Sequence, residues 1–264
     1  MKIPALHYYD ISPNAIAFSS TRHGGYGNGN YKEFNINPFC GDSPEAISKN
    51  KTALCRELGI EESALVFPHQ IHQTRGVVID KEFLGLPESE RKEKLEGFDY
   101  IATQEKGICI GVSTADCVPV LLYFSNPQTI AAIHAGWRGT LKRITLKAVE
   151  ELKKNQGVNA ESCRAIIGPS ISREAFEVGD EVYESFQSEG FDMPSISTRI
   201  NGKWHIDLWK ANAMQLESAG ICAENIRTSG ICTYNNNNAD YFSARRQGIN
   251  SGRIFSGILF KQKA

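Results

Sequence analysis

Two side chains with reactive chemistry stand beside neighbouring apolar runs in residues 111–140, "GVSTADCVPVLLYFSNPQTIAAIHAGWRGT". Cys117 comes just before the first run, and His134 lies at the end of the second, where a Gly-rich turn follows. A thiolate and an imidazole can act as a nucleophile with its base, or they can bind one metal ion together. The same two residues also suit separate structural roles, because most free cysteines are small core residues.

The spacing of these residues predicts that a β-hairpin brings them together. The two apolar runs are joined by the turn sequence "NPQ", and a hairpin of two equal strands returns the chain to its starting level. His72, in "HQIHQT", lies at another expected strand-to-loop transition. Two imidazoles and a thiolate form a ligand set that suits Zn²⁺ and leaves a fourth position for water or substrate. Copper is also compatible with these ligands.

His69 is the competitor of His72 for the same role. Residues three apart on a strand point to opposite faces, so we expect one of the two histidines to point inward. On the residues alone, three interpretations of Cys117 stay open: a metal ligand, a nucleophile paired with His134, and a packing residue. Cys109 and Cys163 lie in apolar strands and are expected in the core.

A second group of candidate residues is cationic. Arg22 precedes paired glycines in "STRHGG", and Arg245 and Arg246 lie in "FSARRQGINSGR". Glycines let backbone N–H groups approach an anion, and guanidinium groups match phosphate oxygens. These stretches therefore predict an anion site, with solvent-exposed or carboxylate-paired arginines as the alternative.

Composition limits the classes of function. The chain has 264 residues and a formal net charge of −1, so no overall positive field recruits nucleic acid or an anionic membrane. No apolar stretch is long enough to span a bilayer. The seven cysteines are odd in number and form no C-x-x-C, which favours reduced thiols and a cytoplasmic protein. No feature of the sequence indicates an oligomeric state.

Periodicity predicts the elements that must position these side chains. Buried strands are expected at 107–113, 118–124, 129–135 and 163–171, with a further strand closing the chain. Helices are expected from the N-cap Ser43 and Pro44 to Gly59, from about Thr140 to Gly157, along Val178, Val182 and Phe186, and from the N-cap Asp207 to Gly220. Residues 14–40 are interpreted as a long ordered loop and residues 81–97 as a solvent-exposed loop or short surface helix. No linker divides the chain, so residues 1–264 are predicted to be one domain of mixed sheets with outer helices.

The order of several motifs resembles one family, the laccase-domain proteins. They were once called polyphenol oxidases and are now described as purine nucleoside phosphorylases with adenosine deaminase activity. The motifs extend over nearly the whole chain: "FSSTRHGGYGNGNYKEFNIN", "HQIHQT", "STADCVPVLLY", "AAIHAGWRGT", "IGPSI", "FEVGDEV" and "YFSARRQGINSGR". The pieces "ADCVPVLL" and "HAGWRGT" are highly specific.

The resemblance implies a ligand set, a fold and a function. The family's zinc ligands come from Q-[VI]-H, A-D-C and H-A-G-W-[RK], which match His72, Cys117 and His134. Gln73 stands where the family often has Gly. The implied fold is α+β, a four-layer sandwich of two packed mixed β-sheets with outer helices. The implied activity is phosphorolysis of adenosine, inosine and methylthioadenosine, together with deamination of adenosine, by a cytoplasmic enzyme that uses purine nucleosides and phosphate.

Roles for further residues follow from this function. A third ligand, His72, favours a metal site over a nucleophile pair, because such a pair needs no third group. Deamination of adenosine needs a proton donor for ammonia, and Asp116 is the candidate, with capping of backbone N–H groups as its other interpretation. Phosphate would be bound by Arg22, Arg245 and Arg246. Asn35 is a candidate hydrogen-bond partner of the substrate, or a turn-forming residue.

Two other functions are kept as alternatives. A copper-dependent polyphenol oxidase would need more copper ligands than six scattered histidines readily supply, and the H-x-H pairs typical of multicopper sites are missing. A role in editing cell-wall precursors is associated with relatives, and it would predict binding of an amino-acyl nucleotide rather than a free nucleoside.

Overall fold

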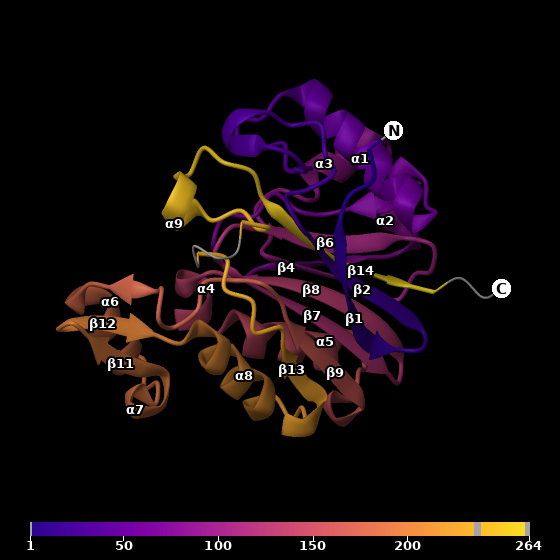
Figure 1. Ribbon diagram of the computed structural model, residues 1–264. Helices are drawn as coiled ribbons and strands as arrows, with labels where there is room; N and C mark the ends of the chain where they lie inside the picture. The colour runs from indigo at the N-terminus through magenta and orange to yellow at the C-terminus, as the bar shows by residue number, and fades with distance from the viewer. Residues whose placement is uncertain (1, 235–238, 262–264) are drawn as a thin grey trace.

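Two larger β-sheets pack face to face, and helices cover their outer surfaces (Figure 1). The computed structural model describes residues 2–234 and 239–261. The first sheet has the order β1-β2-β14-β6-β3, from β1 (Leu6–Ser12), β2 (Ala15–Ser20), β14 (Ile254–Phe260), β6 (Cys109–Thr114) and β3 (Leu65–Val66). The second has the order β13-β9-β7-β8-β5-β4, from β13 (Ile226–Thr228), β9 (Cys163–Ile167), β7 (Val118–Ser125), β8 (Gln128–Ala135), β5 (Tyr100–Thr103) and β4 (Gly76–Ile79).

A small third sheet and the helices complete the fold. The third sheet has the order β10-β12-β11, from β10 (Glu177–Val178), β12 (Lys203–Ile206) and β11 (Ser197–Ile200). The α-helices are α1 (Pro44–Leu58), α2 (Lys81–Gly85), α3 (Glu88–Glu93), α4 (Trp137–Leu141), α5 (Ile144–Gln156), α6 (Asp180–Ser188), α7 (Met193–Ile196), α8 (Leu208–Ser218) and α9 (Ala244–Gln247). Short 3₁₀ turns are η1 (Gly29–Tyr31), η2 (Glu62–Ala64), η3 (Ala160–Ser162) and η4 (Ala223–Asn225).

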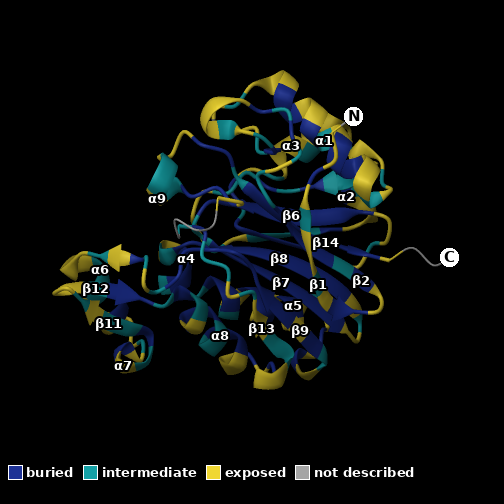
Figure 2. Cartoon of the chain, in the orientation of Figure 1, coloured by how far each residue is buried: buried dark blue, intermediate teal, exposed yellow. Residues whose placement is uncertain are grey.

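Three apolar clusters show that the molecule has four layers. Between the sheets, Ile110 of the first sheet packs with Leu121 and Ala132 of the second. Leu54 of α1 belongs to the cluster on the outer face of the first sheet. Leu216 of α8 belongs to the cluster that covers the second sheet together with α5. The central strands β5, β6, β7, β8 and β14 are accordingly buried, and the outward helix faces are exposed (Figure 2). The predicted α+β four-layer sandwich is confirmed, while the third sheet was not predicted.

Local signals for several elements are also confirmed. The Ser43 side chain accepts the N–H of Ala46 at the start of α1, and Gly59 ends that helix at a φ of 65°. The Asp207 carboxylate accepts the N–H of Lys210 at 2.9 Å and so caps α8. Both caps satisfy N–H groups that have no partner within the helix. Within the described residues, no helix is both long and apolar enough to cross a membrane.

Three expectations about elements are wrong. Residues 14–40 are not one loop, because Ala15–Ser20 forms β2, whose pairing with β14 is a long-range contact. The helix expected from Thr140 is interrupted at Arg143, which has a φ of 61° and separates α4 from α5. Val178 does not share a helix with Val182, since it pairs with Trp204 in the small sheet.

Candidate metal centre

Cys117, His134 and His72 converge on one point at the end of the second sheet. Cys117 comes just before β7, and the β7–β8 hairpin pairs Pro119 with His134. His72 arrives from the loop between β3 and β4. One ligand atom from each of the three side chains lies within 4.8 Å of the other two. The predicted hairpin therefore places its two ends together, and the loop adds the third side chain.

The three side chains of the cluster differ in their exposure to solvent. His72 is exposed, Cys117 is half-buried and His134 is buried. The Sγ atom of Cys117 lies 3.9 Å from Nε2 of His72. The two imidazole rings are 4.8 Å apart between centroids, at 79° to each other. A ligand could therefore approach past His72, while His134 forms the inner wall.

The loop that carries His72 is held in an unusual conformation. His72 has a φ of 62°, in the left-handed region that non-glycine residues rarely adopt. The side chain of Gln70 anchors the loop to the end of β6, because it donates to the Ser113 carbonyl at 2.8 Å and accepts the Ser113 N–H at 2.7 Å. His69 does not join the cluster, since its Nδ1 pairs with Glu96 at 2.7 Å. His72 rather than His69 therefore joins the cluster, from a loop and as its exposed member.

Asp99 connects two of the three side chains. It is fully buried directly before β5, and one carboxylate oxygen lies 2.7 Å from Nδ1 of His134. That same oxygen accepts the backbone N–H of His72 at 2.9 Å. The other oxygen accepts the N–H groups of Gln73 at 2.7 Å and Ile71 at 3.3 Å. The carboxylate thus fixes the ring of His134, leaves its Nε2 for the cluster, and stabilises the left-handed turn at His72.

Sequence reasoning missed Asp99. The only local signal was a lone carboxylate directly before the apolar run "YIAT". Its importance depends on β5 pairing with β8, which places Tyr100 opposite Ile133. That pairing is not indicated by the local sequence.

The charges of the cluster favour an anionic sulfur next to a protonated imidazole when no metal is bound. Burial opposes the thiolate of Cys117, but the charge of His134 and hydrogen bonds from both histidines outweigh it and lower its pKa to about 6. Burial opposes the charged imidazole of His134, but Cys117 and Asp99 outweigh it and raise its pKa. Burial also opposes the ionised carboxylate of Asp99, yet its bonds with His134 and the loop N–H groups keep its pKa below the ordinary value. Metal ligation uses the same thiolate.

Gly136 leaves the space in which the cluster sits. A Cβ atom at this position would lie 3.0 Å from Sγ of Cys117 and 3.1 Å from Cδ2 of His72. Both distances are shorter than ordinary contacts between a Cβ and its neighbours. The glycine in "HAGW" is therefore required by the close approach of two candidate ligands.

The donor set fits a transition metal ion. Imidazole nitrogens and a thiolate are the ligands that zinc and copper prefer, and three protein ligands are typical of catalytic zinc sites. Atoms bound to one tetrahedral zinc are separated by about 3.3–3.6 Å, given bond lengths of about 2.0–2.3 Å. The separations here, up to 4.8 Å, need only a small inward shift of the side chains. The assignment of His72, Cys117 and His134 as metal ligands stays a prediction.

Asp116 uses both carboxylate oxygens to connect neighbouring loops. One oxygen accepts from the hydroxyl of Thr233 at 2.7 Å, and the other accepts the backbone N–H of Arg245 at 2.7 Å. The backbone at Asp116 has a φ of 82°. These contacts agree with the interpretation of a carboxylate that caps N–H groups, and its role as general acid stays a prediction.

The three candidate arginines lie in two places. Burial, followed by the charge of Arg246, lowers the pKa of Arg22. The guanidinium of Arg246 donates to the Tyr241 carbonyl at 2.7 Å. The guanidinium of Arg22 lies over the ring of Phe242, at 5.0 Å from the centroid. Arg245 instead directs its guanidinium to the carbonyl of Glu177 at 3.2 Å. The arrangement supports Arg22 and Arg246 as a cationic pair, whereas Arg245 contributes its backbone N–H to Asp116.

Asn35 connects neighbouring loops, and its role as a hydrogen-bond partner of the substrate stays a prediction. Its side chain is fully buried and donates to Asp42 at 2.9 Å. Its carbonyl oxygen accepts the N–H groups of Asn37 and Arg253, each at 3.1 Å. Asn35 therefore holds two loops together, in agreement with its turn-forming interpretation.

Comparison with known proteins gives consistent results. Residues 16–261 match the family described as multi-copper polyphenol oxidoreductase laccase. A protein named purine nucleoside phosphorylase from Bacteroides thetaiotaomicron is 46% identical over 248 residues, which cover 93% of this chain and 92% of that protein. A protein named adenosine deaminase RL5, from an unknown prokaryotic organism, is 43% identical over 93% of this chain and 94% of its own length.

Solved structures share the same fold. The structure of YlmD from Geobacillus stearothermophilus has a TM-score of 0.87 at 25% identity, and the match covers 99% of this chain and 100% of that one. The structure of YfiH from Bacillus licheniformis has a TM-score of 0.86 at 24% identity, covering 96% of this chain and 99% of that one.

Proposed function

The chain belongs to the family described as multi-copper polyphenol oxidoreductase laccase, and from this premise we propose that it is a zinc-dependent purine nucleoside phosphorylase with adenosine deaminase activity. The proposed substrates are adenosine, inosine and methylthioadenosine, with phosphate as the second substrate. Relatives at 46% and 43% identity carry the names purine nucleoside phosphorylase and adenosine deaminase. The observation that carries the proposal is the convergence of His72, Cys117 and His134. We further propose that residues 1–264 act as one enzyme domain.

In this proposal the three side chains hold one divalent ion. When bound, such an ion supplies Lewis acidity and lowers the pKa of water. Asp99 keeps the Nδ1 of His134 occupied, at 2.7 Å, so that the opposite nitrogen faces the ion. The half-buried thiol of Cys117 favours its anionic form because of the adjacent imidazoles, which makes it ready to bind a cation.

Phosphate would be bound by the cationic pair of Arg22 and Arg246. Phosphorolysis places phosphate against an electron-poor sugar carbon, so the anion must be held and oriented by positive groups. Arg22 is partly shielded from water by the ring of Phe242, and shielding strengthens the attraction between a cation and an anion. Arg245, the neighbour of Arg246 in α9, would add to this binding, and its backbone N–H is held by Asp116 at 2.7 Å.

A copper-dependent oxidase is the second candidate, because the family description names copper and phenol oxidation. In the described part of the chain, His72, Cys117 and His134 are the one group of three or more His, Cys, Asp or Glu side chains that could hold a metal. A multicopper centre requires several ions and correspondingly more ligands. The structure therefore favours the nucleoside function over phenol oxidation.

The test is to incubate pure protein with adenosine, with and without phosphate, and to separate the products by chromatography. Adenine that forms only with phosphate supports phosphorolysis, and inosine that forms without phosphate supports deamination. The absence of both products would overturn the purine assignment. Oxygen consumption with a phenol after loading with copper tests the second candidate in parallel. The variant His72→Ala should lose both activities. His69→Asn is its matched control and should keep them, since His69 lies in the same loop but pairs with Glu96.

A further inference from the structure

Strand β4 forms an open edge of the second sheet. It pairs only with β5 among the described strands, in parallel, with Val77 opposite Ile101. The Arg75 carbonyl accepts the N–H of Tyr100, and the Ile79 carbonyl accepts the hydroxyl of Thr103, so these groups point toward β5. Backbone groups alternate in direction along a strand. The N–H and carbonyl groups of Gly76 and Val78 therefore point away from the sheet.

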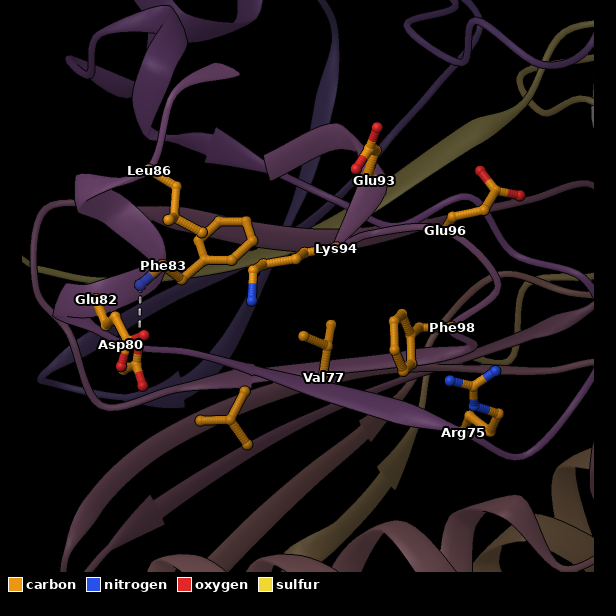
Figure 3. A pocket seen from close by; sticks show the side chains of 11 residues that line it. Arg75, Val77, Asp80, Glu82, Phe83, Leu86, Glu93, Lys94, Glu96 and Phe98 are labelled. Atoms are coloured by element: carbon orange, nitrogen blue, oxygen red, sulfur yellow. Dashed lines mark hydrogen bonds between the residues drawn. The ribbon is translucent and has the colours of Figure 1, made fainter. Parts of the chain in front are cut away.

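A cavity of about 450 Å³ lies along this edge, below α2 and α3 (Figure 3). Its lining includes both Val77 and Val78. Successive side chains of a strand point to opposite faces, and these two do so, because Val77 packs with the cluster between the sheets and Val78 with the cluster under α5. A cavity that touches both faces must wrap around the edge of the strand, where another strand would lie.

The walls of the cavity combine apolar surface with charges of both signs. Figure 3 shows Lys94 between Phe83 and Phe98, on the side of β4 to which Val77 points. The guanidinium of Arg75 lies 4.8 Å from the centroid of the Phe98 ring. The lining also includes the carboxylates of Asp80, Glu82, Glu93 and Glu96. A partner with charges of one sign only would be repelled by part of this lining. A second copy of the same surface carries both signs, so each charge can face an opposite charge.

The order of charges along β4 is self-complementary. Arg75 stands directly before the strand. Asp80, Lys81 and Glu82 follow its end, where the carboxylates outnumber the cation. When two copies of such a strand pair antiparallel about a two-fold axis, the beginning of each meets the end of the other. The cation of one copy then approaches the carboxylates of the other.

We propose that β4 is the interface through which two copies of this chain associate. The outward groups of Gly76 exchange hydrogen bonds with those of the partner's Val78, and the reverse pair does the same. Val77 then lies opposite the partner's Val77 on the two-fold axis. The two six-stranded sheets become one continuous sheet, and each cavity receives the β4 strand of the other copy. No candidate metal ligand takes part in this surface.

Sedimentation velocity over a dilution series of the metal-loaded protein tests the proposal. Wild type is expected to dissociate from dimer to monomer on dilution. Val77→Lys places two cations opposite each other and should weaken association by about tenfold. Val78→Pro removes an N–H group that points outward, which an edge strand tolerates, and should abolish association. Arg75→Glu should weaken association by about fivefold, because both ends of the strand become acidic.

Gln187→Lys, on exposed helix α6, is the control for the added charge and should associate like wild type. Hydrogen exchange of the Gly76 and Val78 amides provides a measurement that needs no variant, since both should become protected as the protein concentration rises. A chain that stays monomeric at all concentrations overturns the proposal, because a second copy then does not bind the β4 edge. Dimers that persist equally in Val77→Lys and Val78→Pro also overturn it.

Discussion

One carboxylate oxygen of Asp99 lies 2.7 Å from Nδ1 of His134 and 2.9 Å from the backbone N–H of His72. These two histidines are far apart in the chain, yet a single buried side chain orients the ring of one and the loop of the other. The position of both candidate ligands therefore depends on a residue that binds no metal itself.

Asp99→Asn tests this dependence. The amide keeps the shape of the carboxylate, but one of its two oxygens becomes an NH₂ group, which is a donor. In either orientation this donor faces other donors, the N–H groups of His134 and His72 or those of Ile71 and Gln73. We expect metal affinity to fall by about 10–100-fold, as for other buried partners of metal-binding histidines. Competition with a chromophoric chelator measures the affinity. Asp207→Asn, which alters a helix cap instead, is the control, and equal affinities for both variants would contradict the role of Asp99.

The thiol of Cys117 should show a shifted pH profile in the metal-free protein. Burial disfavours the thiolate, but the adjacent histidines outweigh it and lower the pKa to about 6. A thiolate is the reactive form, so the alkylation rate should rise as pH increases through about 6 and be nearly maximal at neutral pH. Mass spectrometry can compare Cys117 with Cys222, which is also half-buried. A midpoint near the ordinary thiol value of about 8.5 would refute the predicted charge pair. Added zinc should slow the reaction.

Gly136→Ala should disrupt the cluster by crowding rather than by removing a ligand. The new methyl group would lie 3.0 Å from the Cys117 sulfur and 3.1 Å from the His72 ring. Overpacking of this kind costs about 1–3 kcal/mol, and we expect weaker metal binding in a protein that still folds. Titration calorimetry and thermal unfolding measure the two effects. Gly85→Ala is the control, because no atom lies within 4 Å of its Cβ position. Metal binding equal to that control would contradict the predicted crowding.

Two roles of Asp116 predict different results: a structural link between Thr233 and Arg245, or a proton donor in deamination. Asp116→Asn preserves the left-handed backbone, which asparagine tolerates, but it loses one acceptor. We expect phosphorolysis and deamination to decline together, and Thr233→Val to reproduce part of the loss, since Thr233 donates to the same carboxylate. Loss of deamination alone, with phosphorolysis and Thr233→Val unaffected, would show instead that Asp116 supplies the proton.

The sequence predicted the parts of the site that depend on local chain geometry. The hairpin that joins Cys117 to His134 follows from two adjacent apolar runs and a turn, and the pairing of Pro119 with His134 agrees with it. The caps Ser43 and Asp207 were predicted for the same reason, because their partners lie within a few residues.

Other features depend on contacts that are distant in the chain. The resemblance alone selects His72 over His69, and its left-handed loop is stabilised by Asp99, which directly precedes β5. The contact of Asn35 with the N–H of Arg253 was not predicted, because Arg253 comes from the far end of the chain. The strand Ala15–Ser20 was missed because its Ser- and Ala-rich sequence becomes a strand through pairing with β14.

The most direct test of the central claim is the metal content of the purified protein, measured by inductively coupled plasma mass spectrometry. Wild type, Cys222→Ser and His69→Asn should each bind one equivalent of zinc. Cys117→Ala and His72→Ala should each lose most of it, because two remaining ligands hold the ion weakly. Full zinc occupancy in both of the latter variants would contradict the account of a metal centre formed by His72, Cys117 and His134.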